Sequence, residues 1–323
     1  MTIDFNVVQF VDFIHLQNCT YHVQNCHARA KQALAEMGST IQLEVFVTDA
    51  VGVERYQNQN SRHVVTNSLV RPGILDSTVY TQIPESFYGM YGGPTQYIVC
   101  DPVKNYNCFM NRIDPNRQSW LYQLIRRGIF DQGFVTFNMD PRNKTIPPLE
   151  LFEQQFKEGL DIFKPEHEYI RSQVPYRNFD AHAKLNNVIM QSKFSIVLET
   201  SFDKNEIVTY SEKIFRCLKL PRPWILFAMQ GAVEHLRQLG YDVLDDIVDH
   251  SYDAIDFCID RQVALLDLAE RLCKLEYTPA LVNRLEQAAQ HNRALLDRHQ
   301  LNFVTDVAKS FDLAVDKINE LQI

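Results

Sequence analysis

Residues 194–240 read FSIVLETSFDKNEIVTYSEKIFRCLKLPRPWILFAMQGAVEHLRQLG, and this stretch decides the fold class. Short apolar runs are typical of buried parallel strands, and Pro221 and Pro223 separate the first predicted helix from the strand that follows it. In order, the stretch predicts a strand at Phe194–Leu198, a helix at Tyr210–Lys219, a strand at Trp224–Ala228 and a helix at Ala232–Leu239 that Gly240 closes. This alternation predicts an α/β fold with a parallel sheet.

The same alternation extends toward the N-terminus. Helices are predicted at Val23–Met37, Pro115–Arg127, Leu149–Leu160 and Ala183–Gln191, and strands at Ile41–Thr48, His63–Thr66, Tyr97–Cys100, Cys108–Asn111 and Gly133–Asn138. Residues 71–95 are rich in glycine and proline and are expected to form loops. We therefore expect two Rossmann-like domains, an N-terminal α/β domain at 1–103 and a second at 104–265.

Beyond Ala254 the sequence is almost entirely helical in pattern. One apolar stripe comprises Leu281, Leu285, Ala288, Leu295 and Leu296, and another comprises Phe303, Val307, Phe311, Val315 and Ile318. Two such stripes predict a C-terminal helical hairpin within residues 266–323.

Composition excludes several classes of protein. The 323 residues are 46% hydrophobic and 22% charged, which suits a packed core, and the net charge of −8 disfavours a strongly basic nucleic-acid binder without excluding a local basic groove. The sequence has no apolar run of about 18 residues, and the first residues lack the pattern of a signal peptide, so we expect a cytoplasmic protein with no membrane contact.

The seven cysteines are scattered and form no CxxC pair, as expected of reduced thiols. Cys19, His22, Cys26 and His27 are close in sequence, but no second ligand pair follows at zinc-finger spacing. A helix with buried thiols is the alternative interpretation, and we expect neither a metal nor another cofactor.

Glu199 and the residues near position 212 carry the chemistry. Glu199 follows a predicted buried strand, and the carboxyl ends of parallel strands are where open α/β sheets bind ligands. Thr209 and Glu212 have the spacing of a capping box, and Lys213 lies in the first turn of the helix that they begin. A helix N-terminus with a lysine suits a phosphate or diphosphate, and a carboxylate beside it suits ribose hydroxyls. The alternative is that Glu212 only caps the helix and Lys213 is only solvated.

Residues 104–144 form a locally basic stretch in an acidic protein. The seven basic residues are Lys104, Arg112, Arg117, Arg126, Arg127, Arg142 and Lys144, against three acidic residues, Asp114, Asp131 and Asp140. Such a stretch favours an anionic ligand. Arg126 and Arg127 are equally explained by the end of a helix, which leaves Arg112 and Arg117 as candidates.

These residues resemble the donor-binding half of GT-B glycosyltransferases, in particular the fucosyltransferase-like and exostosin-like families, of the kind encoded by phages and viruses. The matching positions are Glu199, Ser201, Tyr210, Ser211, Glu212, Lys213, Pro221, Pro223 and Gly231. Ser211 stands where those families often have threonine. Residues 109–128, FMNRIDPNRQSWLYQLIRRG, resemble the opening of the same domain, where an arginine contacts the donor diphosphate; Arg112 and Arg117 are the candidates. The resemblance covers residues 105–265.

The resemblance implies a GT-B fold and transfer of a sugar from a nucleotide-sugar to a hydroxyl. The sequence has no Asp-x-Asp motif, so Lys213, an arginine and a helix N-terminus are expected to stabilise the leaving diphosphate without a metal. The resemblance also assigns the acceptor side to residues 1–103. Inversion and retention both stay open. If the reaction inverts, the candidates for the base there are Asp12, His15, Asp49, Asp76 and Glu85, and Asp49 ranks first because it follows a predicted strand.

Several alternatives stay open at this stage. The acceptor is a glycan, a protein or a hydroxymethylated DNA base, and the last would require a basic patch such as Arg62, Arg71, Arg112, Arg126 and Arg127. A non-catalytic GT-B-like binding protein is the main rival to an enzyme. A dehydrogenase or a P-loop NTPase is disfavoured, because neither GxGxxG nor GxxxxGK[ST] is present. The seven aspartates between Asp242 and Asp260 form either a cation site or solvated helix faces.

Overall fold

The computed structural model describes residues 28–29, 32–33, 35–36, 45–48, 63–66, 69–70, 79–82, 95–110, 115–137, 179–199, 202, 207–208 and 210–320. The chain divides into two compact units. The first unit comprises residues 1–93, 204–210 and 293–323, and the second comprises residues 94–203 and 211–292.

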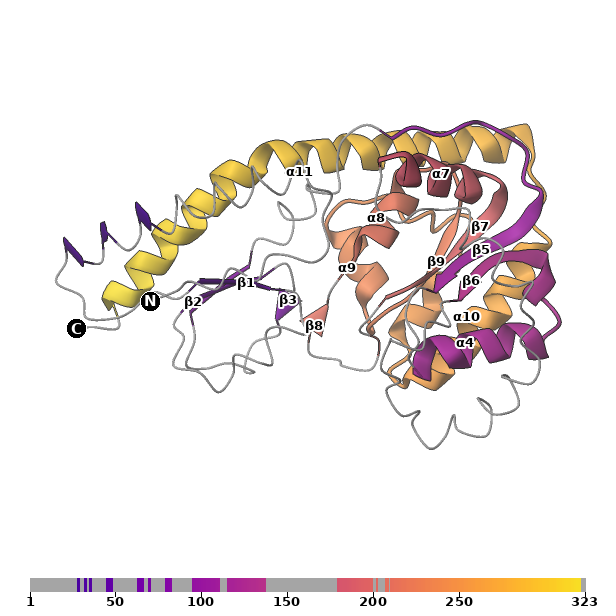
Figure 1. The fold of residues 1–323 in the computed structure, drawn as a ribbon, viewed down its shortest axis with the longest axis horizontal. Coiled ribbons are helices and arrows are strands. Elements are labelled where there is room, and N and C mark those ends of the chain that lie inside the picture. Colours follow the sequence, from indigo (N-terminus) through magenta and orange to yellow (C-terminus); the bar gives the residue numbers. More distant parts are fainter. Residues whose placement is uncertain are drawn as a thin grey trace. The chain divides into compact units, whose positions relative to one another are not determined.

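The second unit contains a four-stranded sheet in which every pair of neighbours is parallel (Figure 1). The strands are β5 (Lys104–Met110), β6 (Gly133–Phe137), β7 (Ser192–Leu198) and β9 (Trp224–Phe227), in the spatial order β6-β5-β7-β9. The register pairs Tyr106 with Phe194 and Ile196 with Ile225. The predicted parallel α/β sheet is therefore confirmed for this part of the chain.

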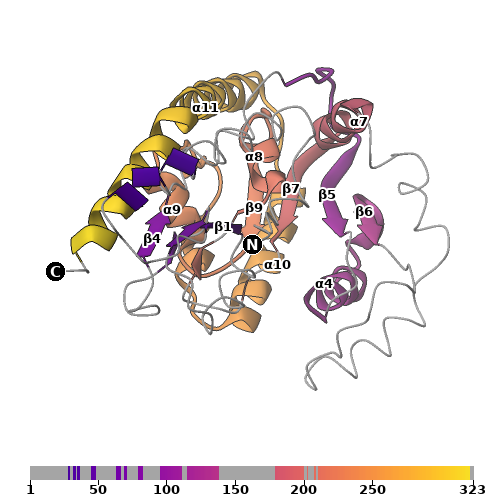
Figure 2. The ribbon, with the colours of Figure 1, turned by 60° about the vertical axis from the view of Figure 1, so that its left-hand side comes forward.

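Helices cover both faces of this sheet, which explains why its central strands are apolar on both sides. The helices α4 (Pro115–Arg126) and α10 (Cys258–Cys273) lie on one face, and α7 (Phe179–Met190) and α8 (Glu212–Leu218) lie on the other (Figures 1 and 2). Phe194, Ile196, Val197 and Leu198 are each at most 4% exposed. Burial of an apolar side chain of this size stabilises the fold by about 1.5–3 kcal/mol.

The strand order creates a switch point between β5 and β7. The chain leaves β5 and forms β6 on one side of it, and then returns to form β7 on the other side. Ligands of open α/β sheets bind outside the carboxyl ends of the strands at such a reversal. In this sheet the reversal lies beyond Met110 of β5 and Leu198 of β7.

The first unit contains a second parallel sheet. Its strands are β1 (Val45–Thr48), β2 (His63–Thr66) and β4 (Val79–Gln82), in that order, and a short antiparallel pair joins β3 (Leu69–Val70) to β8 (Ile207–Val208). The predicted strands at 41–48 and 63–66 correspond to β1 and β2. β4 lies within residues 71–95, which were expected to be loops; its sequence VYTQ has high β-propensity and outweighs the surrounding glycines and prolines.

The prediction of a strand at Tyr97–Cys100 is wrong. Residues 95–102 form no regular structure, and their backbone is instead hydrogen-bonded to side chains of α7. Ile98 N–H donates to Asn187 Oδ1 at 2.9 Å, and Asn186 Nδ2 donates to the Gln96 carbonyl at 3.0 Å. Ile98 and Val99 are 66% and 76% exposed, so the apolar sequence does not reflect a buried strand.

The C-terminal helical hairpin is replaced by one helix, α11 (Pro279–Glu320). Both predicted apolar stripes lie on it, because the intervening residues 297–302, DRHQLN, contain no glycine or proline to end a helix. The helix α10 runs through the expected boundary at 265/266 without a break. The three-part domain division itself stays a prediction.

Candidate functional site

Glu199 lies directly after β7, at the switch point. Its backbone N–H donates to the Phe227 carbonyl of β9 at 2.9 Å, which extends the pairing of the two strands by one bond. Its side chain is buried, and Oε1 accepts the backbone N–H of Ser211 at 3.1 Å. Glu199 therefore connects the ends of β7 and β9 to the start of α8.

Ser211 is the N-cap of α8. Its backbone is extended (φ −103°, ψ 174°), and its Oγ accepts the backbone N–H of Lys213 at 3.3 Å. The predicted capping box between Thr209 and Glu212 is wrong. Glu212 is the first helical residue, whereas a capping box requires the glutamate at the third.

Lys213 points back toward the end of β7. Its Nζ donates to the Leu198 carbonyl at 3.2 Å. Burial raises the pKa of Glu199, while the positive charge of Lys213 and the hydrogen bonds from Ser211 lower it; burial dominates, so the net shift is upward. The positive charge of Lys213 therefore acts on the buried Glu199 side chain at the switch point.

The charges that act on the Cys108 thiol indicate that Arg117 lies near the same site as Lys213. Burial raises the pKa of this β5 thiol to about 12, and the positive charges of Arg117 and Lys213 partly oppose the rise. Arg117 lies in the first turn of α4, just after β5, and is only 2% exposed. The positive charges of two residues from different helices thus both act on Cys108 of β5, although Arg117 is buried.

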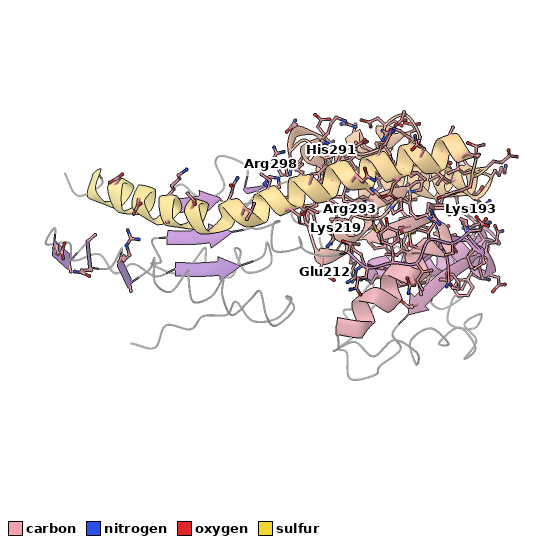
Figure 3. All side chains as sticks on the ribbon, turned by 90° about the horizontal axis from the view of Figure 1, so that it is seen from above. Lys193, Glu212, Lys219, His291, Arg293 and Arg298 are labelled. Carbon is pink, nitrogen blue, oxygen red and sulfur yellow. The ribbon has the colours of Figure 1, made fainter. Side chains whose placement is uncertain are left out.

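The other predicted site residues are distributed as follows. Glu212, labelled in Figure 3, is partly exposed at the start of α8. Tyr210 is 4% exposed and belongs to the first compact unit. Asp49, Arg112 and Ser201 lie outside the described residues, as do the alternative bases Asp12, His15, Asp76 and Glu85. The structure therefore brings together Glu199, Ser211, Glu212 and Lys213, with Arg117 nearby.

The carboxylate of Asp253 accepts backbone N–H groups at the start of the next helix, α9 (Ala232–Gln238). The sequence patterns did not predict this role. The Asp253 Oδ2 accepts the Glu234 backbone N–H at 2.9 Å, and its carboxylate also accepts the N–H groups of Ala232 and Val233. The first turn of α9 is thus occupied by an internal carboxylate 19 residues away from Glu234, a distance at which no local sequence pattern operates.

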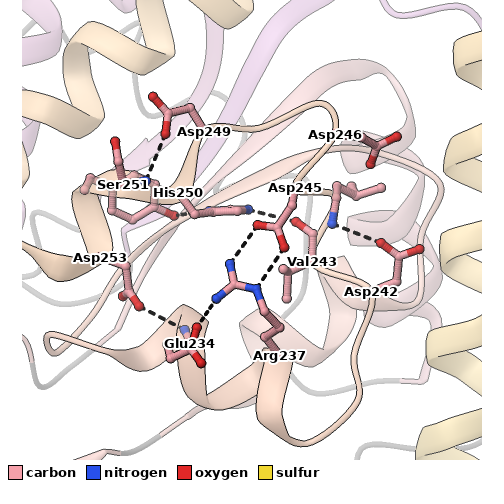
Figure 4. A network of polar contacts seen from close by, with 12 residues as sticks. Glu234, Arg237, Asp242, Val243, Asp245, Asp246, Asp249, His250, Ser251 and Asp253 are labelled. Atoms are coloured by element: carbon pink, nitrogen blue, oxygen red, sulfur yellow. Dashed lines mark hydrogen bonds and ion pairs between the residues drawn. The ribbon is translucent and has the colours of Figure 1, made fainter.

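The aspartates of residues 242–260 are mostly engaged in ion pairs and caps, several of which Figure 4 shows. Arg284 contacts Asp242 and Asp246, Arg237 contacts Asp245, and Asp249 caps the 3₁₀ helix η4 (His250–Ala254). Over the described part of the chain, no three His, Cys, Asp or Glu side chains cluster as a metal site would require. Several of these aspartates are largely solvated as well, since the side chains of Asp245, Asp246 and Asp249 are 52%, 52% and 63% exposed.

Two further expectations need correction. His235, expected on a helix surface, is 8% exposed, and burial lowers its pKa. It faces inward because Val233 and Leu236, on the same short helix, are also buried. Arg127 does more than end a helix: it forms ion pairs with Asp267 at 2.6 Å and Glu270 at 2.9 Å, which tie α4 to α10.

The chain matches no family model and no curated protein. Among solved structures, it is similar to one described as the DNA modifying enzyme beta-glucosyltransferase in the presence and absence of the substrate uridine diphosphoglucose. The TM-score is 0.41 at 9% identity, over 84% of this chain and 73% of that chain. None of the helices in the described residues combines the length and apolar character that crossing a membrane requires.

Proposed function

We propose that the protein is a glycosyltransferase that moves a sugar from a nucleotide-sugar to a hydroxyl acceptor without a metal. The observation that carries the proposal is the hydrogen-bonded group of Glu199, Ser211 and Lys213 at the carboxyl end of β7. It lies at the reversal of strand order, where α/β sheets bind nucleotides. The sequence resemblance to GT-B donor domains falls on these same residues.

Each residue has a role in the proposed reaction. Lys213 Nζ exchanges the Leu198 carbonyl for a diphosphate oxygen, and Arg112 and Arg117 add positive charge from the β5 side. Glu199 accepts ribose hydroxyls. Ser201, Tyr210, Ser211 and Glu212 complete the donor site.

The bond changes follow from this arrangement. The acceptor oxygen forms a bond to the anomeric carbon as the bond from that carbon to the diphosphate oxygen breaks. If the reaction inverts the anomeric configuration, the acceptor proton passes to a carboxylate or a histidine, with Asp49 as the first candidate. Negative charge develops on the leaving diphosphate, and Lys213 and the arginines stabilise it there.

The acceptor class follows from charge only in part. A net charge of −8 disfavours duplex DNA relative to a glycan or a protein, because duplex binding depends on neutralising phosphates. A hydroxymethylated DNA base, as in phage DNA modification, stays within the proposal. We further propose that the protein works in the cytoplasm, or in the host cytoplasm if it is viral.

A non-catalytic binding protein of the same shape is the second candidate, and one observation favours it. The side chains of Glu199 and Lys213 both bond to backbone groups of this chain, so their positions also serve the packing of β7 against α8. In that case a nucleotide would still bind, or the site would be purely structural.

A thermal-shift panel with UDP, GDP, CMP, ADP and their common sugar conjugates tests the proposal. A ligand at 100 times its Kd adds about 2.7 kcal/mol to the unfolding free energy. We expect one nucleotide class to raise Tm with or without EDTA, and K213A to abolish the rise. K274A is the matched control, because Lys274 is an exposed lysine after the end of α10.

Two results would overturn the proposal. The absence of a shift with every nucleotide would favour the structural reading of the site, and a shift that needs a metal would contradict metal-free stabilisation of the leaving group. Turnover of the bound nucleotide-sugar, followed as release of the nucleoside diphosphate, separates an enzyme from a binding protein.

A further inference from the structure

Arg261 of α10 is a buried cation that holds several chain segments together. Its side chain is 1% exposed. Nη1 donates to the carbonyls of Ile255 and Asp256, the latter at 3.1 Å, and Nη2 donates to the Phe202 carbonyl. Burial of a guanidinium is costly, and these hydrogen bonds offset part of that cost, while Nε has no hydrogen-bond partner within the part of the chain that the structure describes.

Phe227, the last residue of β9, packs against both Arg261 and Phe202. The Arg261 Cζ lies 5.9 Å from the centroid of the Phe227 ring, and the Phe202 ring stacks on Phe227 with centroids 5.4 Å apart and planes inclined by 26°. Trp120 of α4 meets the same ring edge-on at 5.3 Å. Aromatic and cation–π contacts of this kind fix orientation as well as adding stability.

Phe227 also contacts Glu199. Its carbonyl accepts the Glu199 N–H at 2.9 Å, and Phe202 is the third residue after Glu199 in the chain. The chain therefore contacts Phe227 at two nearby points: through the backbone N–H of Glu199 and, three residues later, through the ring of Phe202. Arg261 secures the second of these contacts through the Phe202 carbonyl.

We propose that Arg261 is a positioning residue for the donor site: by bonding the Phe202 carbonyl beside the Phe227 ring, it fixes the chain that leaves β7 and so holds Glu199 where it accepts ribose hydroxyls. This inference rests on the proposed function, because it assigns Glu199 to the donor. Arg261 acts through Phe202 and Phe227 and does not touch the nucleotide itself.

Two variants test the role. R261K keeps the charge but loses the planar fork that reaches three carbonyls, and F202A removes the stacked ring while leaving Arg261 intact. R271K is the matched control, because Arg271 lies on the same helix with its side chain 61% exposed. Amide hydrogen exchange over residues 199–203 reports the anchoring, and titration with the nucleotide selected by the thermal-shift panel reports the donor site.

We expect R261K and F202A each to speed exchange at residues 199–203 by about tenfold and to weaken nucleotide binding by about tenfold, with R271K unchanged in both. Unchanged exchange in R261K and F202A would overturn the anchoring. Faster exchange with unaltered nucleotide affinity would reduce Arg261 to a structural residue. If the wild-type protein binds no nucleotide, the proposed function fails, and with it the positioning role, while the exchange data still decide whether Arg261 anchors Phe202.

Discussion

The backbone N–H of Ser211 donates to Glu199 Oε1 at 3.1 Å across 12 positions of sequence. One carboxylate thus fixes the N-cap of α8 relative to the end of β7, while the Glu199 backbone N–H bonds to β9. The residue that the sequence assigns to the donor is therefore also a structural connection.

Replacing Glu199 by glutamine separates binding from stability. Burial raises the pKa of Glu199 above its ordinary value of 4.5, so between these two pKa values the folded state holds a proton that the unfolded state has lost. The wild-type free energy of unfolding therefore falls as pH rises through this window. The glutamine of E199Q does not titrate, so this variant does not lose stability through the same pH range. We therefore expect its Tm relative to wild type to increase from acid toward neutral pH. Its nucleotide affinity should fall about tenfold. A Tm difference that is independent of pH would contradict the raised pKa of Glu199.

Removing the Ser211 hydroxyl tests the N-cap. S211A leaves the Lys213 backbone N–H without its side-chain acceptor, and loss of such a cap costs about 1 kcal/mol. We expect urea denaturation to show this decrease with an unchanged m value. S211T keeps the hydroxyl and should retain most of the stability. Equal losses in S211A and S211T would mean that packing around Ser211, and not capping, is what the substitution disturbs.

His250 should make stability depend on pH. Its Nε2 lies 2.8 Å from the Val243 carbonyl and its Nδ1 lies 2.9 Å from the Tyr252 hydroxyl, and burial lowers its pKa below 6.5. As pH falls below 6.5, the unfolded state takes up a proton before the folded state does, so the stabilisation from neutral His250 is lost. We expect the stability advantage of wild type over H250Q, measured by urea denaturation, to shrink between pH 7 and pH 5.

His235 provides the internal check on that measurement. Burial lowers its pKa too, so the single variant H250Q retains part of the pH dependence. The double variant H235Q/H250Q should show a smaller dependence than either single variant over the same range. An advantage of wild type over H250Q that stays constant with pH would show that His250 contributes through packing alone.

Arg284 should stabilise the start of α11 through two aspartates. It forms paired hydrogen bonds with Asp242 at 2.7 and 2.9 Å and with Asp246 at 2.7 and 2.8 Å. Burial raises the pKa of Asp242, but the hydrogen bonds from Arg284, the hydrogen bond from the Leu244 backbone N–H and the positive charge of Arg284 together outweigh it, so the pKa is lowered. Because the Arg284 side chain is partly exposed, we expect R284A to lower the free energy of unfolding by only about 1 kcal/mol, and by less in high salt.

A double-mutant cycle checks this network. The coupling between R284A and D242N should exceed the coupling between R284A and D246N, because Asp242 is the less exposed partner, at 28% against 52%. Equal and negligible coupling energies would show that these ion pairs are only surface contacts. R284K, which keeps the charge without the fork, should recover only part of the stability.

Local sequence patterns were sufficient for several elements of the second unit. Runs such as Phe194–Leu198 and Trp224–Phe227 are apolar and short, with helix-compatible segments between them, and the structure contains them as β7 and β9. Gly128, predicted to end a helix, has φ +67°, a conformation that suits glycine. Periodicity and residue preference act over a few neighbours, which is why they could be read directly.

Local patterns failed where partners come from distant positions. The stretch Tyr97–Cys100 looks like a strand, but its hydrogen bonds go to α7 side chains about 90 residues away. Asp253 at the start of α9 and Arg261 beside Phe202 left no local signal, because each acts on backbone groups far along the chain. Arg117 was predicted as a ligand contact, and only the packing revealed that it is buried.

The sequence by itself determined the α/β class and most of the alternation of strands and helices in the second unit, and it led to the prediction that Glu199 and Lys213 bind the donor. These follow from hydrophobic periodicity and from residue types at the ends of strands. Only the tertiary structure decided the strand order β6-β5-β7-β9, and with it the switch point that brings Glu199, Lys213 and Cys108 together. The physical reason is that strand order depends on which apolar faces pack across the sheet, a choice made by contacts between residues distant in sequence.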